Sequence, residues 1–190
     1  MGSALAYLAL YDSLSEASRY KSRSLFQWVT SSGQAFCLHA KCGRATETVE
    51  DHCDVSKGTD VKHLCTAIKE RHGRLDYAFN NGGSGGRSAP VATTTEEAWR
   101  KTIDGFLTSV FLCMRHQIPL MPEGGGGVIV NNSSVDGLRG YPLPGGAAYS
   151  AAKHGVLGLT KSAALEHATS GLRRAAISPL RPLTVQREPA

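Results

Sequence analysis

The stretch that decides the fold is residues 128–161, VIVNNSSVDGLRGYPLPGGAAYSAAKHGVLGLTK. It opens with three β-branched apolar residues, 128–130, which follow four glycines and are typical of a buried parallel strand. Two serines, Ser133 and Ser134, come where this strand should end. A loop rich in glycine and proline leads into an Ala-rich run, 147–167, that suits a helix. The stretch therefore predicts a strand, a loop and a helix, which is the element order of an α/β protein.

Tyr149 and Lys153 lie four residues apart in the predicted helix, so they share one of its faces. An ammonium beside a phenol favours the phenolate and lowers the phenol pKa from about 10. A phenol tuned in this way can transfer a proton near neutral pH, and a serine hydroxyl at the strand end can polarise a carbonyl. The Tyr-x-x-x-Lys spacing alone is a weak motif, but its position after the strand, the serines and the loop favours a functional origin.

This stretch resembles the short-chain dehydrogenase/reductase family. In that family the strand-end serine, the tyrosine and the lysine are the catalytic groups, so the resemblance implies that Ser134, Tyr149 and Lys153 are catalytic. The loop between Ser134 and Tyr149 is about two residues longer than is usual in the family, with residues 143–146 as the insertion. Ser133 therefore stays open as the alternative serine.

Further motifs resemble the family's cofactor-binding segments. Asp54-Val55 matches an Asp-Val beside the adenine ring, and residues 80–83, NNGG, resemble an Asn-Asn-Ala-Gly run that supports the adenosine side. The resemblance implies an NAD or NADP cofactor held by Asp54, Val55, Asn81, Gly82, Gly83, Tyr149, Lys153 and Pro179. Two alternatives stay open: Asp54 as the cap of the next helix, and the Asn-Gly dipeptide as a simple turn.

The remaining pattern predicts a Rossmann-like, three-layer parallel sheet over residues 46–180. We expect strands at 48–55, 75–79, 128–130 and 172–178. We expect one helix with an apolar stripe ended by Gly73, and another from a capping box at Thr94 and Glu97 to about Ile118. Residues 1–45 contain no recognisable pyrophosphate-binding unit, and the last helix–strand unit of the family is missing, so the fold is expected to be incomplete. Residues 181–190 are expected to be an unstructured tail.

The resemblance also suggests that the chain is not fully active. It places Phe106 where the family has an asparagine that holds a water in the proton relay behind the lysine. The glycine-rich pyrophosphate turn is absent, and Leu180 replaces a glycine after Pro179. The sequence therefore carries two hypotheses. One is an NAD(P)-dependent oxidoreductase acting on a small alcohol or ketone. The other is a truncated, inactive remnant that is at most a folded module or a homo-oligomer through helices 95–118 and 147–167.

Composition narrows the classes of function. With 41% hydrophobic and 19% charged residues, the 190-residue chain is globular, and no apolar run is long enough to cross a membrane. The net charge of +5 comes from scattered basic residues, which does not favour nucleic-acid binding. Five cysteines without a secretion signal indicate reduced thiols in the cytoplasm. The spacing of Cys37, His39, Cys42, His52 and Cys53 matches no usual zinc motif, so no metal is expected.

Overall fold

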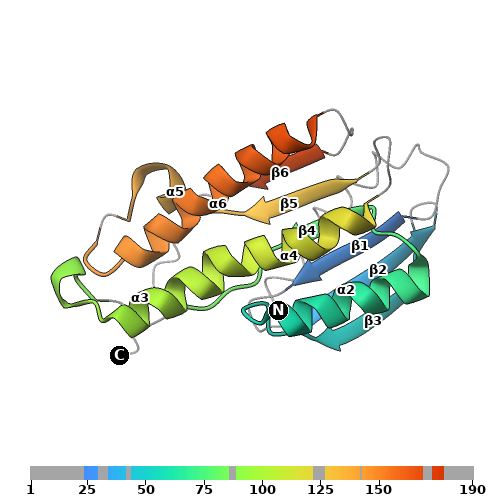
Figure 1. Ribbon diagram of the computed structural model, residues 1–190, viewed down its shortest axis with the longest axis horizontal. Helices are drawn as coiled ribbons and strands as arrows, with labels where there is room; N and C mark the ends of the chain where they lie inside the picture. Colours follow the sequence, from blue (N-terminus) through green and yellow to red (C-terminus); the bar gives the residue numbers. More distant parts are fainter. Residues whose placement is uncertain are drawn as a thin grey trace, which may run out of the picture.

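The protein forms one mixed sheet with helices packed against it. The structure is a computed structural model that describes residues 24–29, 34–41, 44–85, 89–121, 127–141, 143–168 and 173–177. Within these ranges it describes the side chains from Cys53 to Ala168. The strands are β1 (Ser24–Val29), β2 (Gln34–Lys41), β3 (Arg44–His52), β4 (Tyr77–Asn80), β5 (Val128–Asn132) and β6 (Arg173–Ile177). Their order across the sheet is β3-β2-β1-β4-β5-β6 (Figure 1).

Strand directions confirm the α/β class and refine the expectation of a parallel sheet. β1 pairs in parallel with β4, β4 with β5, and β5 with β6. β2 is antiparallel to both β1 and β3, so it is the one reversed strand of the six. Residues 1–45, for which the sequence predicted no element, therefore contain β1 and β2 of the sheet. They also contain the start of β3, at Arg44.

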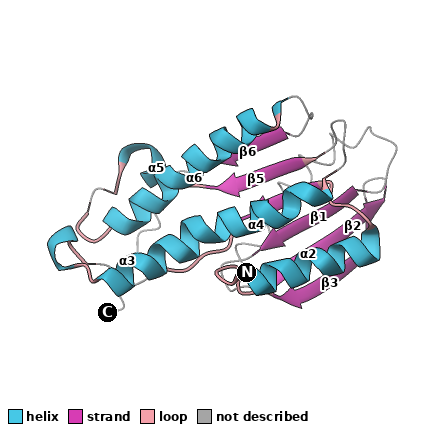
Figure 2. Ribbon diagram, viewed as in Figure 1, coloured by secondary structure: helices cyan, strands magenta, loops and turns pink. Residues whose placement is uncertain are grey.

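The helices of the described residues lie on one face of the sheet (Figure 2). They are α2 (Gly58–His72), α3 (Glu96–Ile103), α4 (Ser109–Gln117), α5 (Asp136–Arg139) and α6 (Ala147–Glu166). Short 3-10 turns, η2 (Val91–Thr93) and η4 (Ile118–Leu120), flank the middle helix, and a π-helical turn, η3 (Asp104–Thr108), joins α3 to α4. The described residues thus supply two of the three expected layers.

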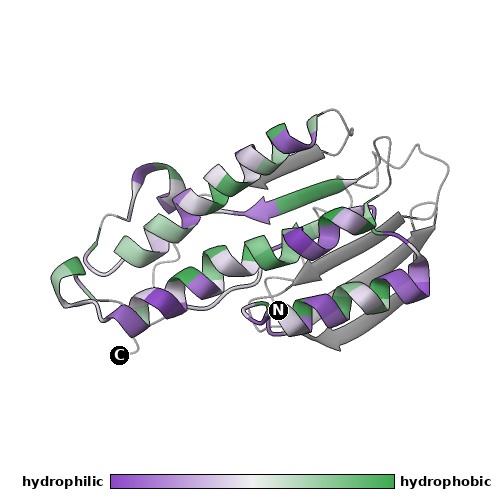
Figure 3. Cartoon of the chain, in the orientation of Figure 1, coloured by the Kyte–Doolittle hydropathy of each residue, from purple (hydrophilic) through white to green (hydrophobic). Residues whose placement is uncertain are grey.

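Alternating burial along β4 and β5 explains how the sheet meets these helices. Ala78 and Ile129 are buried and contribute to the apolar core, whereas their neighbours along each strand are only half-buried. Figure 3 shows β5 changing from hydrophobic to hydrophilic at its carboxyl end. The predicted apolar stripe of α2 is confirmed, and it adds four residues to the core: Val61, Leu64, Cys65 and Ile68. Helix α4 adds three more: Val110, Cys113 and Met114.

One of two predicted helix ends is confirmed and the other is shifted. Gly73 ends α2 in the left-handed conformation (φ 78°), as predicted. The capping box at Thr94 is wrong by one residue, because Thr95 is the N-cap of α3 and its side chain accepts a hydrogen bond from Ala98 N. Thr94 instead donates its hydroxyl hydrogen to Ala89 O at 2.9 Å, which holds the preceding turn.

Strand ends differ more than strand positions. The strand expected at 48–55 is β3, which ends at His52, and the strand expected at 75–79 is β4, which ends at Asn80. β5 continues two residues beyond the apolar run, to Asn132. Pro179, Leu180 and residues 181–190 lie outside the described residues.

Candidate active site

The candidate site lies where β4 and β5 end and α6 begins. These strands are parallel neighbours, and Asn80 is opposite Asn131 in their register. The next residue of each strand meets across the same edge, where Asn132 Nδ2 donates a hydrogen bond to Asn81 Oδ1. The carboxyl ends of adjacent parallel strands therefore bring the predicted Asn81 next to the residues that follow β5.

Lys153 is the most buried charged group of this site. Its side chain enters from the second turn of α6, only 5% of the residue is exposed, and its ammonium donates a hydrogen bond to Asn132 O at 2.7 Å. Burial lowers the pKa of Lys153 from 10.5 to about 8, because desolvation disfavours the charged form. Among the described residues no charged side chain contributes to this pKa shift.

Two aromatic rings enclose the Lys153 ammonium. The nitrogen lies 5.6 Å from the centroid of the Tyr149 ring and 5.1 Å from that of Phe106, both within cation–π range. The Phe106 and Tyr149 rings meet edge to face, with centroids 5.0 Å apart and planes at 87°. The structure therefore brings Tyr149 and Lys153 together on one face of α6, as their spacing predicts, and places Phe106 against both.

The two serines after β5 have different partners. Ser133 donates a hydrogen bond to the backbone O of Lys153 at 2.9 Å, so its hydroxyl ties the strand end to α6. Ser134 Oγ lies 3.3 Å from Asp136 Oδ2, to which it donates, and it accepts from Asp136 N at 3.2 Å. Both serines are buried, and Ser134 is the one whose hydroxyl interacts with the short helix α5 rather than with α6.

The glycine loop after β4 packs closely on the helix opposite. A Cβ added to Gly83 would come within 2.5 Å of Phe106 Cδ1, and one added to Gly105 within 1.8 Å of Ser84 O. Gly82 and Gly83 are themselves half-buried. The loop thus touches the same phenylalanine ring that covers Lys153.

Asp54 and Val55 follow β3 rather than ending it. Asp54 Oδ1 accepts hydrogen bonds from Ser56 N at 3.1 Å and Ser56 Oγ at 2.7 Å, and its other oxygen lies 3.3 Å from the Lys57 ammonium. The Ser56 side-chain hydrogen bond is the chief cause that lowers the Asp54 pKa below 3.8. The alternative of Asp54 as a helix cap is wrong, because the N-cap of α2 is Lys57, without a side-chain cap. Val55 is 7% exposed and belongs to the core.

Sequence reasoning missed a buried polar network behind the site. Asn80 Nδ2 donates to Asn131 Oδ1 at 2.9 Å and exchanges hydrogen bonds with the Gln117 amide at 2.9 and 3.1 Å. Asn131 Nδ2 donates to Thr160 Oγ1 at 2.9 Å. These bonds join β4, β5, α4 and α6 through side chains that are at most 5% exposed. The sequence feature that could have revealed this network is the Asn-Asn pair at the ends of β4 and β5. In each pair the first asparagine is buried and joins the network.

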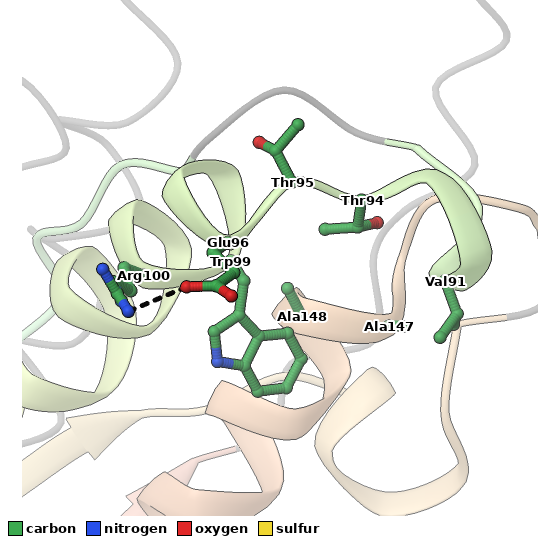
Figure 4. A pocket seen from close by; sticks show the side chains of 8 residues that line it. All are labelled: Val91, Thr94, Thr95, Glu96, Trp99, Arg100, Ala147 and Ala148. Carbon is green, nitrogen blue, oxygen red and sulfur yellow. Dashed lines mark hydrogen bonds and ion pairs between the residues drawn. The ribbon is translucent and has the colours of Figure 1, made fainter.

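A pocket of about 410 Å³ lies beside the site, between η2, α3 and the first turn of α6. Figure 4 shows Trp99 reaching from α3 toward α6, with the ion pair of Arg100 and Glu96 (2.9 Å) beside it. Trp99 is 43% exposed. Ala147 and Ala148, which immediately precede Tyr149, form the opposite wall.

Neither a metal-binding cluster nor a membrane-spanning helix occurs among the described residues. No group of three or more histidine, cysteine or acidic side chains in this part of the chain could hold a metal ion, and the side chains of Cys37, His39, Cys42 and His52 lie outside it. No helix among these residues is both long and apolar enough to span a membrane.

Comparison with known proteins points to one family. A family model described as enoyl-(acyl carrier protein) reductase matches residues 31–186. The chain is 46% identical over 127 residues to a 3beta-hydroxysteroid dehydrogenase of Mediterraneibacter gnavus, a match that covers 67% of this chain and 45% of that protein. It is 40% identical over 133 residues to levodione reductase of Leifsonia aquatica, with 70% and 49% covered. The chain thus spans about half the length of the curated relatives it matches.

Solved structures agree with this comparison. A short-chain dehydrogenase from Mycobacterium smegmatis superposes with a TM-score of 0.61 at 39% sequence identity. The match covers 67% of this chain and 52% of the other.

Proposed function

Because the chain belongs to the short-chain dehydrogenase/reductase family, we propose that it is an NAD(H)- or NADP(H)-dependent oxidoreductase that interconverts an alcohol and a ketone. The observation that carries this proposal is the buried ammonium of Lys153, held 5.6 Å from the centroid of the Tyr149 ring. A buried cation beside a phenol is the arrangement that makes the phenol a proton donor and acceptor near neutral pH.

In the direction of ketone reduction, the Tyr149 hydroxyl donates its proton to the carbonyl oxygen of the substrate. Ser134 holds that oxygen by a hydrogen bond, and the positive charge of Lys153 stabilises the phenolate that the proton leaves behind. Because the Lys153 pKa is about 8, the side chain is still mainly cationic at pH 7. A nicotinamide cofactor, when bound beside Lys153 and Tyr149, would supply the hydride, and with the proton of Tyr149 this would balance the conversion of a ketone to an alcohol.

The polar groups at this edge suit a ligand with hydroxyl donors. Asn132 Oδ1 is buried and has no hydrogen-bond partner among the described residues, although Asn132 Nδ2 and O are both paired. A buried acceptor without a donor is costly, and a ribose hydroxyl would satisfy it. We assign Lys153 and Tyr149 to the nicotinamide ribose side and Asn81, Gly82 and Gly83 to the adenosine side. Asp54 and Val55 are assigned to the adenine, and Pro179 to the nicotinamide end.

A second candidate function is a folded, non-catalytic module, and the start of the sheet favours it. After β1 the chain returns as the antiparallel strand β2, so no described helix follows β1 with an N-terminus that could receive a pyrophosphate. Phe106, at the position where the resemblance expects an asparagine, has no polar group to hold a relay water.

Titration of the purified full chain with NADH and NADPH separates the two candidates. Binding followed by cofactor fluorescence, with a matching rise in Tm, supports the oxidoreductase, since a ligand of the native state stabilises it by mass action. A folded chain that binds neither nucleotide rejects it. If binding occurs, a hydroxysteroid and levodione are the first compounds to screen, and Tyr149→Phe should abolish turnover while leaving nucleotide binding in place.

We also propose that α3–α4 and α6 form a contact between copies of this chain. These helices carry large apolar side chains on the surface: Trp99 is 43% exposed, Phe111 44% and Leu165 79%. Light scattering after size-exclusion chromatography should then give a mass above that of one chain, and Phe111→Asp should lower it. A monomeric wild-type protein at tens of micromolar would contradict the contact.

A further inference from the structure

Phe106 occupies an unusual place in the helix that faces α6. It lies in η3, where the backbone widens for one π-helical turn between α3 and α4. Such turns are rare and occur mostly as single-turn bulges at functional sites. The turn presents the ring sideways, toward α6, while the next turn of α4 packs Val110 and Met114 into the core.

One side of the ring belongs to the catalytic pair of the proposed function. The Lys153 ammonium lies 5.1 Å from the centroid of the Phe106 ring, and the Tyr149 ring meets Phe106 edge to face at 5.0 Å. Among the described residues, this ammonium donates a hydrogen bond to Asn132 O alone. Two aromatic rings therefore enclose the part of the ammonium that water would otherwise solvate.

The same ring also packs against the loop that follows β4. A Cβ on Gly83 would meet Phe106 Cδ1 at 2.5 Å, and a Cβ on Gly85 would meet Phe106 Cε2 at 3.1 Å. The first contact is too close for any side chain, and the second would require the ring to yield slightly. The Phe106 ring thus contacts both the loop 83–85 and the pair of Tyr149 and Lys153.

We infer that Phe106 is a positioning residue that couples the glycine loop to the Tyr149–Lys153 pair, holding the ammonium against an aromatic face and excluding water from it. The inference rests on the proposed function only for the roles of Tyr149 and Lys153. The contacts of the Phe106 ring and their effect on Lys153 do not depend on whether the chain turns over a ketone.

The Phe106 ring has two opposing effects on the Lys153 pKa, and these determine the direction of the change expected in each variant. The ring keeps water away, which lowers the Lys153 pKa, and its π face attracts the cation, which raises it. A leucine at position 106 keeps the site dry but removes the π face, so Phe106→Leu should lower the Lys153 pKa by about 0.5. An alanine admits water, so Phe106→Ala should raise the pKa from about 8 toward 10.5.

The measurement is competitive labelling of lysines with acetic anhydride between pH 6 and 11, with Lys153 followed by mass spectrometry of its peptide. It uses the full chain without cofactor or substrate, so it reports on Lys153 even if the protein has no activity. Phe79→Leu is the matched control, because it makes the same side-chain change on β4, where Phe79 alternates with the buried Ala78 and Asn80 and so faces away from the helices, and it should leave the Lys153 pKa unchanged. An unchanged or raised pKa in Phe106→Leu overturns the inference, and this variant decides alone if the alanine variant does not fold.

Coupling to the loop is tested by a double-mutant cycle. Gly85→Ala should change the Lys153 pKa when Phe106 is present and leave it unchanged in the Phe106→Leu background, because the ring carries the effect. Equal changes in both backgrounds, or none in either, would overturn the coupling. Failure of nucleotide binding would reject the proposed function while leaving these outcomes readable.

Discussion

Replacing Lys153 with methionine should change how the stability of the protein depends on pH. The ammonium is 5% exposed, and burial lowers its pKa from 10.5 to about 8. Between these two values the unfolded chain binds a proton that the folded chain does not, so the free energy of unfolding rises with pH in this window. Below pH 8 both states are protonated and the full penalty for burying the charge is present.

The size of this effect follows from the same two pKa values. At 1.36 kcal/mol for each pKa unit, the difference between 10.5 and about 8 corresponds to about 3 kcal/mol. About 2 kcal/mol of this is recovered between pH 7 and pH 9.5, because Lys153 is then almost neutral in the folded state. The methionine variant has no ionisable group at this position, so its free energy of unfolding lacks this increase between pH 7 and pH 9.5.

Urea unfolding at pH 7.0, 8.5 and 9.5 tests this reasoning. The stability of the wild type relative to Lys153→Met should increase by about 2 kcal/mol across this series. Lys161→Met, which removes an exposed lysine of the same helix, serves as the control and should follow the wild type. Parallel pH profiles for the wild type and Lys153→Met would refute the claim that burial lowers the Lys153 pKa.

Three further predictions concern packing, all read from the urea midpoint. Asn131→Leu should destabilise the fold by about 3 kcal/mol, because it leaves buried partners such as Thr160 without their hydrogen bonds; a loss below about 1 kcal/mol would argue against the network. Gly105→Ala should cost at least about 2 kcal/mol, since its Cβ would meet Ser84 O at 1.8 Å, and a neutral effect would show that the loop is not packed there. Gly158→Ala should instead stabilise α6 by about 0.5–1 kcal/mol, because its Cβ meets nothing within 4 Å; destabilisation would contradict this open position.

The elements that the sequence predicted well are those defined by burial periodicity. The stripe of α2 and its end at Gly73 were predicted correctly, and the Ala-rich run of α6 was found to within one residue at its ends, because helical spacing of apolar or small residues determines which face packs. Strand ends were less accurate, since β3 stops where the Asp54 turn begins and β5 continues through Asn132, and neither turn nor pairing is visible in hydrophobicity.

The β1–β2 hairpin was not predicted, and the place of β1 in the sheet depends on a strand far along the chain. β1 lies between β2 and β4, and its parallel partner β4 begins at Tyr77, almost fifty positions later. Local composition between residues 24 and 41 mixes polar and apolar residues and has no clear period. Only the tertiary arrangement identifies these residues as strands.

For the site, the spacing of residues could be predicted from the sequence, but the partners of each side chain could not. The four-residue separation of Tyr149 and Lys153 was enough to place them on one face of α6. The partners of Ser134 and Phe106 depend on α5 and on the π-helical turn, and neither element leaves a pattern that sequence periodicity detects.

The wide turn at Asp104–Thr108 has a consequence for how this helix tolerates change. An α-helix rotates about 100° per residue, so one additional residue in a single turn rotates everything beyond it by that angle. Trp99 lies before this turn, in α3, and is 43% exposed, whereas Met114 lies after it, in α4, and is 2% exposed. An insertion or deletion of one residue usually disrupts the packing of a helix, but the wide turn at Asp104–Thr108 can accommodate it. The sequences of α3 and α4 can therefore change independently of each other.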